Sequence, residues 1–172
     1  MSHSWKWKSQ RFAAVILLAL SATLLVAPAL FSAHRTQADQ DQSADLWSQA
    51  ETVSAADFVR ELGAANASKS PTIVYAGFRT LFEGGHVSGA VFHGTASTEK
   101  GLAELQQWLA GLPRSTNLVL YCGCCPFARC PNIRPAYKAV HQMGFTHVRV
   151  LVLPTSFAAD WVEKGYPMSK GL

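Results

Sequence analysis

The sequence predicts an α/β fold with a mainly parallel central sheet that is covered by helices on both faces. Two observations predict it: short apolar runs without charged residues alternate with segments of helical periodicity, and the apolar runs are rich in β-branched residues. Uncharged strands that alternate with helices are typical of parallel sheets, because such strands are buried on both faces. The length of 172 residues suffices for one such domain and an N-terminal appendage.

The expected elements follow one another along the chain. A first helix is expected after Ser54, which forms a capping pattern with Asp57, and Gly63 ends its apolar periodicity. Strands are expected at 71–76, 87–93, 117–122 and 147–153, and further helices at 102–112 and 135–143. A last helix is expected to be capped by Thr155 and to bury Trp161.

The first 33 residues have the composition of a signal peptide or an N-terminal membrane anchor. Lys6, Lys8 and Arg11 precede residues 12–31, which carry no charge and are dominated by alanine, leucine and valine. An apolar span of about twenty residues can cross a bilayer as a helix, whereas a positive segment before a shorter apolar span is typical of a cleaved signal. The length of this span favours an anchor and the small residues at 27–29 favour cleavage, so both alternatives stay open.

Either alternative places the rest of the chain outside the cytoplasm, because the positive residues lie before the span. We therefore expect a periplasmic protein, anchored in the membrane or secreted, with segment 1–33 followed by a polar linker at 34–50 and a folded domain at 51–172. The formal net charge is +4, but several positive residues lie in the targeting segment, so no nucleic-acid partner is expected. The sequence contains neither a Gly-rich phosphate loop nor a haem attachment motif, and no cofactor is expected.

All four cysteines lie between positions 122 and 130, directly after the strand expected at 117–122. Ligand sites in parallel sheets lie at the carboxyl ends of strands, so this loop is the candidate active site. A thiol reacts as its thiolate, and a free cysteine with a pKa of ~8.5 needs help to ionise at neutral pH. Backbone amides of a tight turn and the N-terminus of the next helix can supply that help. The candidate site residues are Cys122, Gly123, Cys124, Cys125, Arg129, Cys130 and Arg134, and spacing does not select which arginine points inward.

Three segments, in chain order, resemble the rhodanese family of sulfurtransferases. They are Gly85-His86-Val87-Ser88-Gly89-Ala90, the strand Val119-Leu120-Tyr121-Cys122, and the C-terminal pattern of Gly144-Phe145, Trp161 and Gly165-Tyr166-Pro167. The cysteine loop is also similar to that of an exported bacterial subgroup of rhodanese-like proteins. The resemblance implies a rhodanese-like fold in which Cys122 accepts a sulfane sulfur and forms a persulfide. It implies a small donor such as thiosulfate and a thiol acceptor as partners, and a structural role for His86.

The sequence departs from the family pattern in three places. Val74-Tyr75-Ala76-Gly77 stands where the first strand usually ends in Asp-x-Arg. The usual short loop Cys-x-x-Gly-x-Arg is replaced by residues 122–135, and Leu153-Pro154-Thr155 replaces the Gly-Gly that commonly follows the last strand. These departures leave the expected fold unchanged and leave the substrate open.

Several functions fit a loop with four cysteines. In sulfur transfer, which we expect first, Cys122 is the nucleophile and Cys124, Cys125 or Cys130 resolves the persulfide. In thiol–disulfide exchange, Cys122 and Cys125 form a C-x-x-C pair. Clustered soft thiolates can also hold Cu(I) or Zn(II), although no metal ligands are assigned here. An inert binding domain with a loop held by disulfides is the last alternative.

Overall fold

The computed structural model describes residues 46–65 and 70–172, which belong to one compact unit that starts at Asp45. The expected signal peptide or anchor at 1–33 lies outside the described residues, as does most of the expected linker. Within the described part of the chain, none of the helices combines the length and apolar character that a membrane span requires. Trp47, which falls in the expected linker, is buried against Phe127 and Tyr137.

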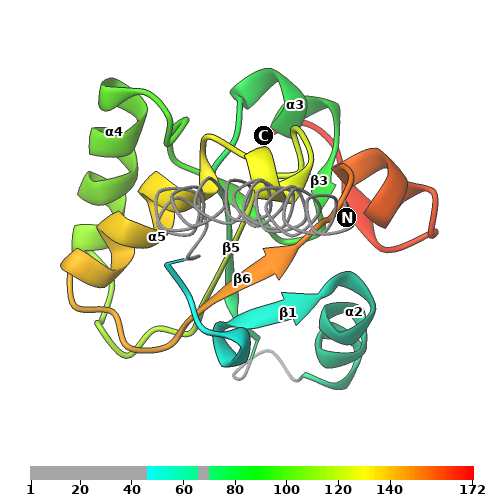
Figure 1. Cartoon of the computed structure of the whole chain (residues 1–172), viewed down its shortest axis with the longest axis horizontal. Coiled ribbons are helices and arrows are strands. Elements are labelled where there is room, and N and C mark those ends of the chain that lie inside the picture. Colours follow the sequence, from blue (N-terminus) through cyan, green and yellow to red (C-terminus); the bar gives the residue numbers. More distant parts are fainter. Residues whose placement is uncertain (1–45, 66–69) are drawn as a thin grey trace, which may run out of the picture. The chain divides into compact units, whose positions relative to one another are not determined.

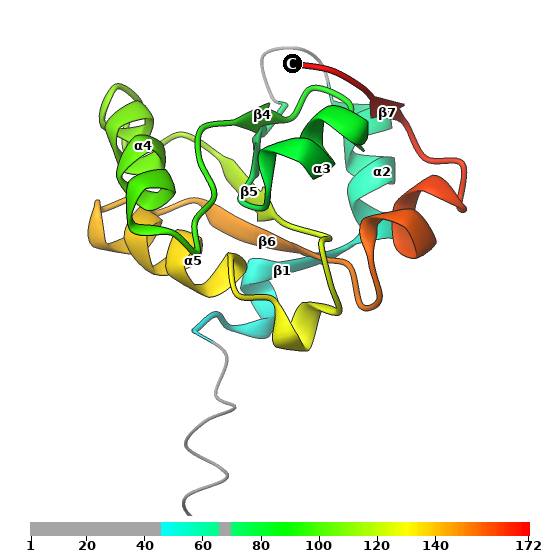
Figure 2. The ribbon, with the colours of Figure 1, turned by 90° about the horizontal axis from the view of Figure 1, so that it is seen from above.

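A five-stranded parallel sheet forms the centre of the domain, as the alternation of strands and helices predicted (Figures 1 and 2). Its strands lie in the order β1 (Thr52–Ser54), β6 (Val148–Val152), β5 (Leu118–Tyr121), β2 (Thr72–Tyr75) and β4 (Val91–Phe92). All neighbouring pairs in this sheet are parallel. A separate antiparallel pair joins β3 (His86–Val87) to β7 (Met168–Ser169). Because β5 is flanked on both sides, the residue that follows it lies in the middle of the carboxyl edge of the sheet.

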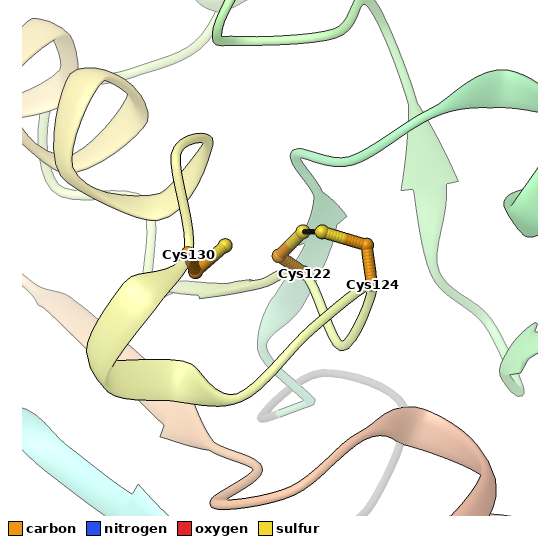
Figure 3. Close-up of side chains that lie close together, drawn as sticks. All are labelled: Cys122, Cys124 and Cys130. Carbon is orange, nitrogen blue, oxygen red and sulfur yellow. Dashed lines mark hydrogen bonds between the residues drawn. The ribbon is translucent and has the colours of Figure 1, made fainter.

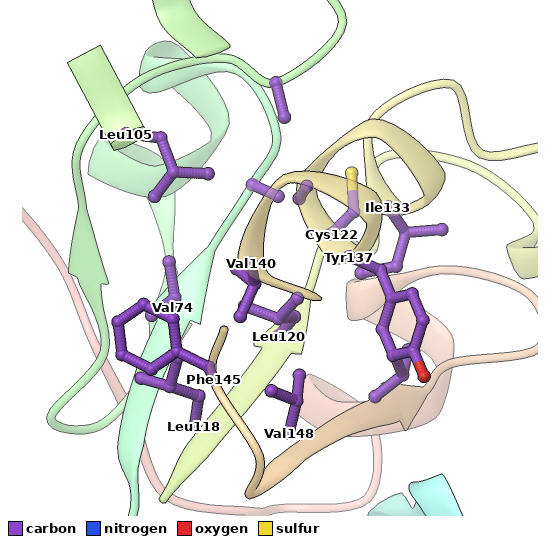
Figure 4. Packing of buried hydrophobic residues seen from close by; sticks show 14 of the residues in the cluster. Val74, Leu105, Leu118, Leu120, Cys122, Ile133, Tyr137, Val140, Phe145 and Val148 are labelled. Carbon is purple, nitrogen blue, oxygen red and sulfur yellow. The ribbon is translucent and has the colours of Figure 1, made fainter. Parts of the chain in front are cut away.

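Helices cover both faces of the sheet, and the side chains of β5 alternate between two apolar clusters. Leu118 and Leu120 belong to the first cluster (Figure 4), together with side chains of α4 (Glu99–Ala110) and α5 (Ile133–Gln142). Val119 and Tyr121 belong to the second cluster. That cluster includes side chains of α2 (Ala55–Ala64), α3 (Arg79–Gly84) and the π-helical turn η3 (Ala158–Val162). Burial on both faces explains why the strand sequence contains no charge.

Two expected elements differ from the structure. The strand expected at 87–93 is divided into β3 and β4, because Gly89 has a φ of 80° and the Ala90 N–H donates back to the Val87 carbonyl. Thr155 does not cap the last helix; the carboxylate of Asp160 instead accepts hydrogen bonds from the backbone N–H groups of Thr155 and Ser156. The short elements β1, α3 and β7 and the 3-10 turns η1 (Gln49–Glu51) and η2 (Phe127–Arg129) were not predicted.

Candidate active site

The loop that follows β5 starts with Cys122 and is held in place by contacts on both sides. The Tyr121 hydroxyl accepts a hydrogen bond of 2.9 Å from the Val87 N–H, which fixes the end of the strand. Gly123 has a φ of 73°, and a Cβ at this position would lie 2.8 Å from the Cβ of Phe157. The Gly123 carbonyl accepts a hydrogen bond of 2.9 Å from the Phe157 N–H. Glycine is thus required here both by the backbone conformation and by the close approach of the segment that leads into η3.

Three of the four thiols form a compact cluster (Figure 3). The Sγ atoms of Cys122, Cys124 and Cys130 all lie within 4.8 Å of one another. The Cys122 thiol donates to Cys124 Sγ at 3.1 Å, and Cys125 Sγ lies 3.3 Å from Cys124 Sγ. The contact of Cys122 is thus with Cys124, whereas the C-x-x-C spacing had suggested Cys125. All four cysteines are free thiols in the structure.

Asn132, which the sequence analysis did not select, organises this cluster. Its side chain is fully buried, and its Nδ2 donates to Cys122 Sγ at 3.5 Å and to Cys124 Sγ at 3.6 Å. Its Oδ1 accepts a hydrogen bond of 3.1 Å from the Ser97 N–H. The position just before α5 would normally suggest a capping residue, but its side chain makes no capping hydrogen bond. Only the folding of the loop back towards Cys122 gives this asparagine its contacts with sulfur.

The charge of the cluster is centred on Cys130. The neighbouring Cys122 thiol lowers the pKa of the Cys130 thiol to about 5, with further help from the backbone N–H groups of Asn132 and Ile133 at the start of α5. The same interaction between the two thiols, together with burial, raises the pKa of Cys122. Burial also raises the pKa of Cys125, to about 12. The help expected from a helix N-terminus is therefore present, but it acts on Cys130, whereas the pKa of Cys122 is raised by its charged neighbour and by burial.

The two arginines of the predicted site have different surroundings. Arg129 lies in η2 and is exposed to solvent. The Arg134 guanidinium lies over the ring of Trp47, 5.4 Å from its centroid. A neighbouring thiol and backbone N–H groups chiefly lower the pKa of Cys130. The ionisation of Cys130 therefore does not require either arginine.

A cavity of about 410 Å³ opens beside the cluster. Cys124 and Gly123 line it, together with Tyr75, α3 residues and residues near η3. Cys122 and Cys130 are only 4% and 3% exposed and are not part of its lining. A molecule in this cavity therefore meets Cys124 before it meets either buried thiol.

Gly77 is the last residue of the segment that stands in place of the family's Asp-x-Arg, and it lies directly against the cluster. A Cβ at Gly77 would lie 2.9 Å from Cys122 Sγ and 2.5 Å from the Tyr75 hydroxyl. Any side chain here would therefore displace the thiol or the phenol. His86, by contrast, is buried, with its Nδ1 2.8 Å from the Phe82 carbonyl oxygen and its ring stacked on the Phe82 ring. These contacts fit the structural role expected for His86.

Comparisons with known proteins bear on the fold. No protein-family model and no curated protein sequence matches the chain. The solution structure of the rhodanese-like domain of the Alr3790 protein from Anabaena sp. has a TM-score of 0.51 and 19% identity, over 70% of this chain and 79% of that chain. A crystal structure of the same protein has a TM-score of 0.49 and 19% identity, over 70% and 93% of the two chains. A persulfide form of EanB with ergothioneine has a TM-score of 0.46 and 20% identity, over 69% and 28%. The described domain thus has a rhodanese-like fold, as the sequence motifs implied.

Proposed function

We propose that this rhodanese-like domain transfers sulfane sulfur through a persulfide on Cys122, in a compartment outside the cytoplasm. One observation supports the proposal most: Cys122 follows the central strand β5, and its sulfur lies 3.1 Å from a second thiol that faces a cavity. The carboxyl edge of a parallel sheet is where such folds bind ligands. Cys124 then connects the buried thiol to molecules that enter the cavity.

The chemistry is a sequence of nucleophilic displacements at sulfur without net oxidation. A cysteine thiolate attacks the sulfane sulfur of the donor, the bond between that sulfur and the rest of the donor breaks, and the donor leaves with the bonding electron pair. For thiosulfate the leaving group is sulfite. The outer sulfur of the resulting persulfide can pass between Cys124 and Cys122 in the same way, because one thiolate attacks it and the other leaves as a thiolate. A thiol acceptor finally takes the sulfur and restores the free cysteine.

Cys130 supplies the negative charge that these displacement steps need. Cys122 and Cys130 share one proton: Cys130 holds the charge at rest, and Cys122 becomes the nucleophile only as the proton moves to Cys130 during attack on the donor sulfur. The side-chain N–H groups of Asn132 donate to Cys122 and Cys124 and stabilise the charge as it moves between these sulfur atoms.

Intact-mass measurements on the purified protein test the proposal. Incubation with thiosulfate under anaerobic, metal-free conditions should add one sulfur atom, and cyanide should remove it. Cys122→Ser should abolish transfer to cyanide, whereas Cys124→Ser should slow it and Cys125→Ser should have a smaller effect. Retained transfer in Cys122→Ser would refute the assignment of Cys122 as the carrier of the persulfide.

The compartment needs a separate test, since it depends on residues 1–33 alone. A reporter enzyme that folds only outside the cytoplasm, fused after the domain, should be active with these residues and inactive without them. Activity of the shortened fusion would contradict an extracytoplasmic location. The mass of the protein recovered from cells would also separate a cleaved signal from a retained anchor.

A second candidate function is favoured by the sulfur geometry. A metal ion held by three thiolates at bonds of ~2.3 Å needs sulfur atoms about 4 Å apart, and the three Sγ atoms lie within 4.8 Å of one another. Soft thiolate ligands of this kind select Cu(I) over harder cations. Tight binding of one Cu(I), lost in Cys130→Ser, together with no sulfur transfer in metal-free protein, would favour this function over the first.

A further inference from the structure

The cavity beside Cys124 has a shape and a chemistry that bear on the substrate. Its volume of about 410 Å³ falls within the range of sites that hold organic ligands. The five heavy atoms of thiosulfate would fill a small part of it. Cys124 and Tyr75 line it together with residues of α3, the segment around η3 and Met168.

The walls of this cavity are mainly apolar, and part of that apolar surface is open to water. Leu81 and Val162 line the cavity and are 47% and 41% exposed, which is unusual for such side chains. Phe157 and Met168 add to the apolar lining of the same cavity. A ligand with an apolar body would cover these side chains, whereas a small hydrated anion would leave them exposed.

The charges around the cavity point to the same kind of ligand. Among the described residues that line it, Lys170 alone carries a charge, and its side chain is exposed at the C-terminal end of the chain. A dianion placed against apolar walls needs several cations or hydrogen-bond donors to replace its hydration. One lysine at the rim can instead pair with one negative group at the far end of an otherwise apolar molecule.

We infer that the sulfur donor or acceptor of this domain is an organic thiol or persulfide with an apolar body and a single anionic group, bound with its sulfur at Cys124. This inference rests on the proposed sulfur transfer and adds the substrate class to it. The Cys124 thiolate attacks the outer sulfur of the organic persulfide, the sulfur–sulfur bond breaks, and the organic thiolate leaves with the electron pair. Cys124 then holds the sulfur, which passes to Cys122 across the 3.1 Å contact.

Two probes test the inference, one reactive and one inert. The persulfide of mercaptomethylbenzoate should load the protein with sulfur faster than thiosulfate at equal concentration. The corresponding methyl thioether has the same body but no transferable sulfur. It should slow alkylation of Cys124 by iodoacetamide, as measured by peptide mass spectrometry, whereas the same concentration of sulfate should not.

A matched pair of variants shows whether the cavity is responsible. Leu81→Arg places a charged side chain on the cavity wall and should weaken protection by the thioether about tenfold, since covering a leucine side chain contributes roughly that factor to binding. Phe78→Arg changes a similarly exposed apolar residue, 42% exposed, that does not line the cavity and should leave protection unchanged.

The outcomes separate this inference from the function on which it rests. Absence of protection by the thioether in a protein that accepts sulfur from thiosulfate would overturn the substrate class and leave sulfur transfer intact. Protection without sulfur loading by any donor would support the apolar ligand and refute the transfer. Equal loss of protection in Leu81→Arg and Phe78→Arg would also overturn the inference, because the effect would then not come from the cavity.

Discussion

Replacing Cys122 should change the ionisation of Cys130 in a way that depends on the replacement. The neighbouring Cys122 thiol is the largest cause of the lowered pKa of Cys130, which is about 5. A hydrogen bond to a charged group contributes about 1.5 to 3 kcal/mol, and one pKa unit corresponds to about 1.4 kcal/mol. Cys122→Ala should therefore raise the pKa of Cys130 by about one to two units. Cys122→Ser keeps a donor of similar size and should leave the pKa nearly unchanged.

The ultraviolet absorbance of the thiolate, followed as a function of pH, measures this directly. In the wild type, the absorbance should disappear as the pH falls through about 5, because Cys130 is then protonated. Subtracting the titration of Cys130→Ser isolates this thiol from the other three. A Cys122→Ala curve with the wild-type midpoint would show that the backbone N–H groups alone stabilise the thiolate. An equal shift in the alanine and serine variants would show that packing, and not hydrogen bonding, is responsible.

Three further changes have distinct expected results. Gly123→Ala should lower the free energy of unfolding in urea by about 1 to 3 kcal/mol, because its Cβ would meet Phe157, whereas Gly63→Ala, with open space around its Cβ, should not be destabilising. Asn132→Asp keeps an acceptor for the Ser97 N–H but loses both N–H donors to sulfur, so persulfide formation should slow and its pH profile should move upward. The stability advantage of the wild type over Cys130→Ser should shrink as the pH falls from ~8.5 towards about 5, because the lowered pKa stabilises the fold only while the thiol is ionised.

The sheet and its main helices could be predicted because their signals are local and long enough. Buried strands such as β5 need an uncharged apolar run, and α4 needs leucines at helical spacing, so both can be recognised without tertiary information. The missed elements have only a few residues each, and β1 exists mainly because its backbone pairs with β6. Thr155 was wrongly predicted as the cap of η3 for a related reason. The Asp160 carboxylate, five residues further on, accepts the hydrogen bond of the Thr155 N–H.

The position of the candidate site could be predicted from the sequence, but the role of each thiol in it could not. The end of β5 and the four nearby cysteines located it, since strand ends and thiol chemistry are both visible in the sequence. Which thiol carries the charge depends on how the loop folds back, because Cys130 gains its backbone donors from the start of α5. Asn132 has no sequence signal for contacting sulfur, and its role emerges only when Ser97 and the thiols enclose it.

The three departures from the rhodanese pattern meet at one place in the folded chain. Gly77, in the first departure, lies against Cys122 Sγ. Leu153 belongs to the third departure and approaches Gly123 of the second, the cysteine loop. Pro154, also in the third departure, accepts a hydrogen bond of 3.2 Å through its carbonyl from the Phe127 N–H of that loop. All three segments lie where strands of the same parallel sheet end, so they meet at its carboxyl edge, where the thiol cluster lies. All three departures therefore surround the thiol cluster, and under the proposed sulfur transfer this is where a different sulfur donor or acceptor would be accommodated on the same fold.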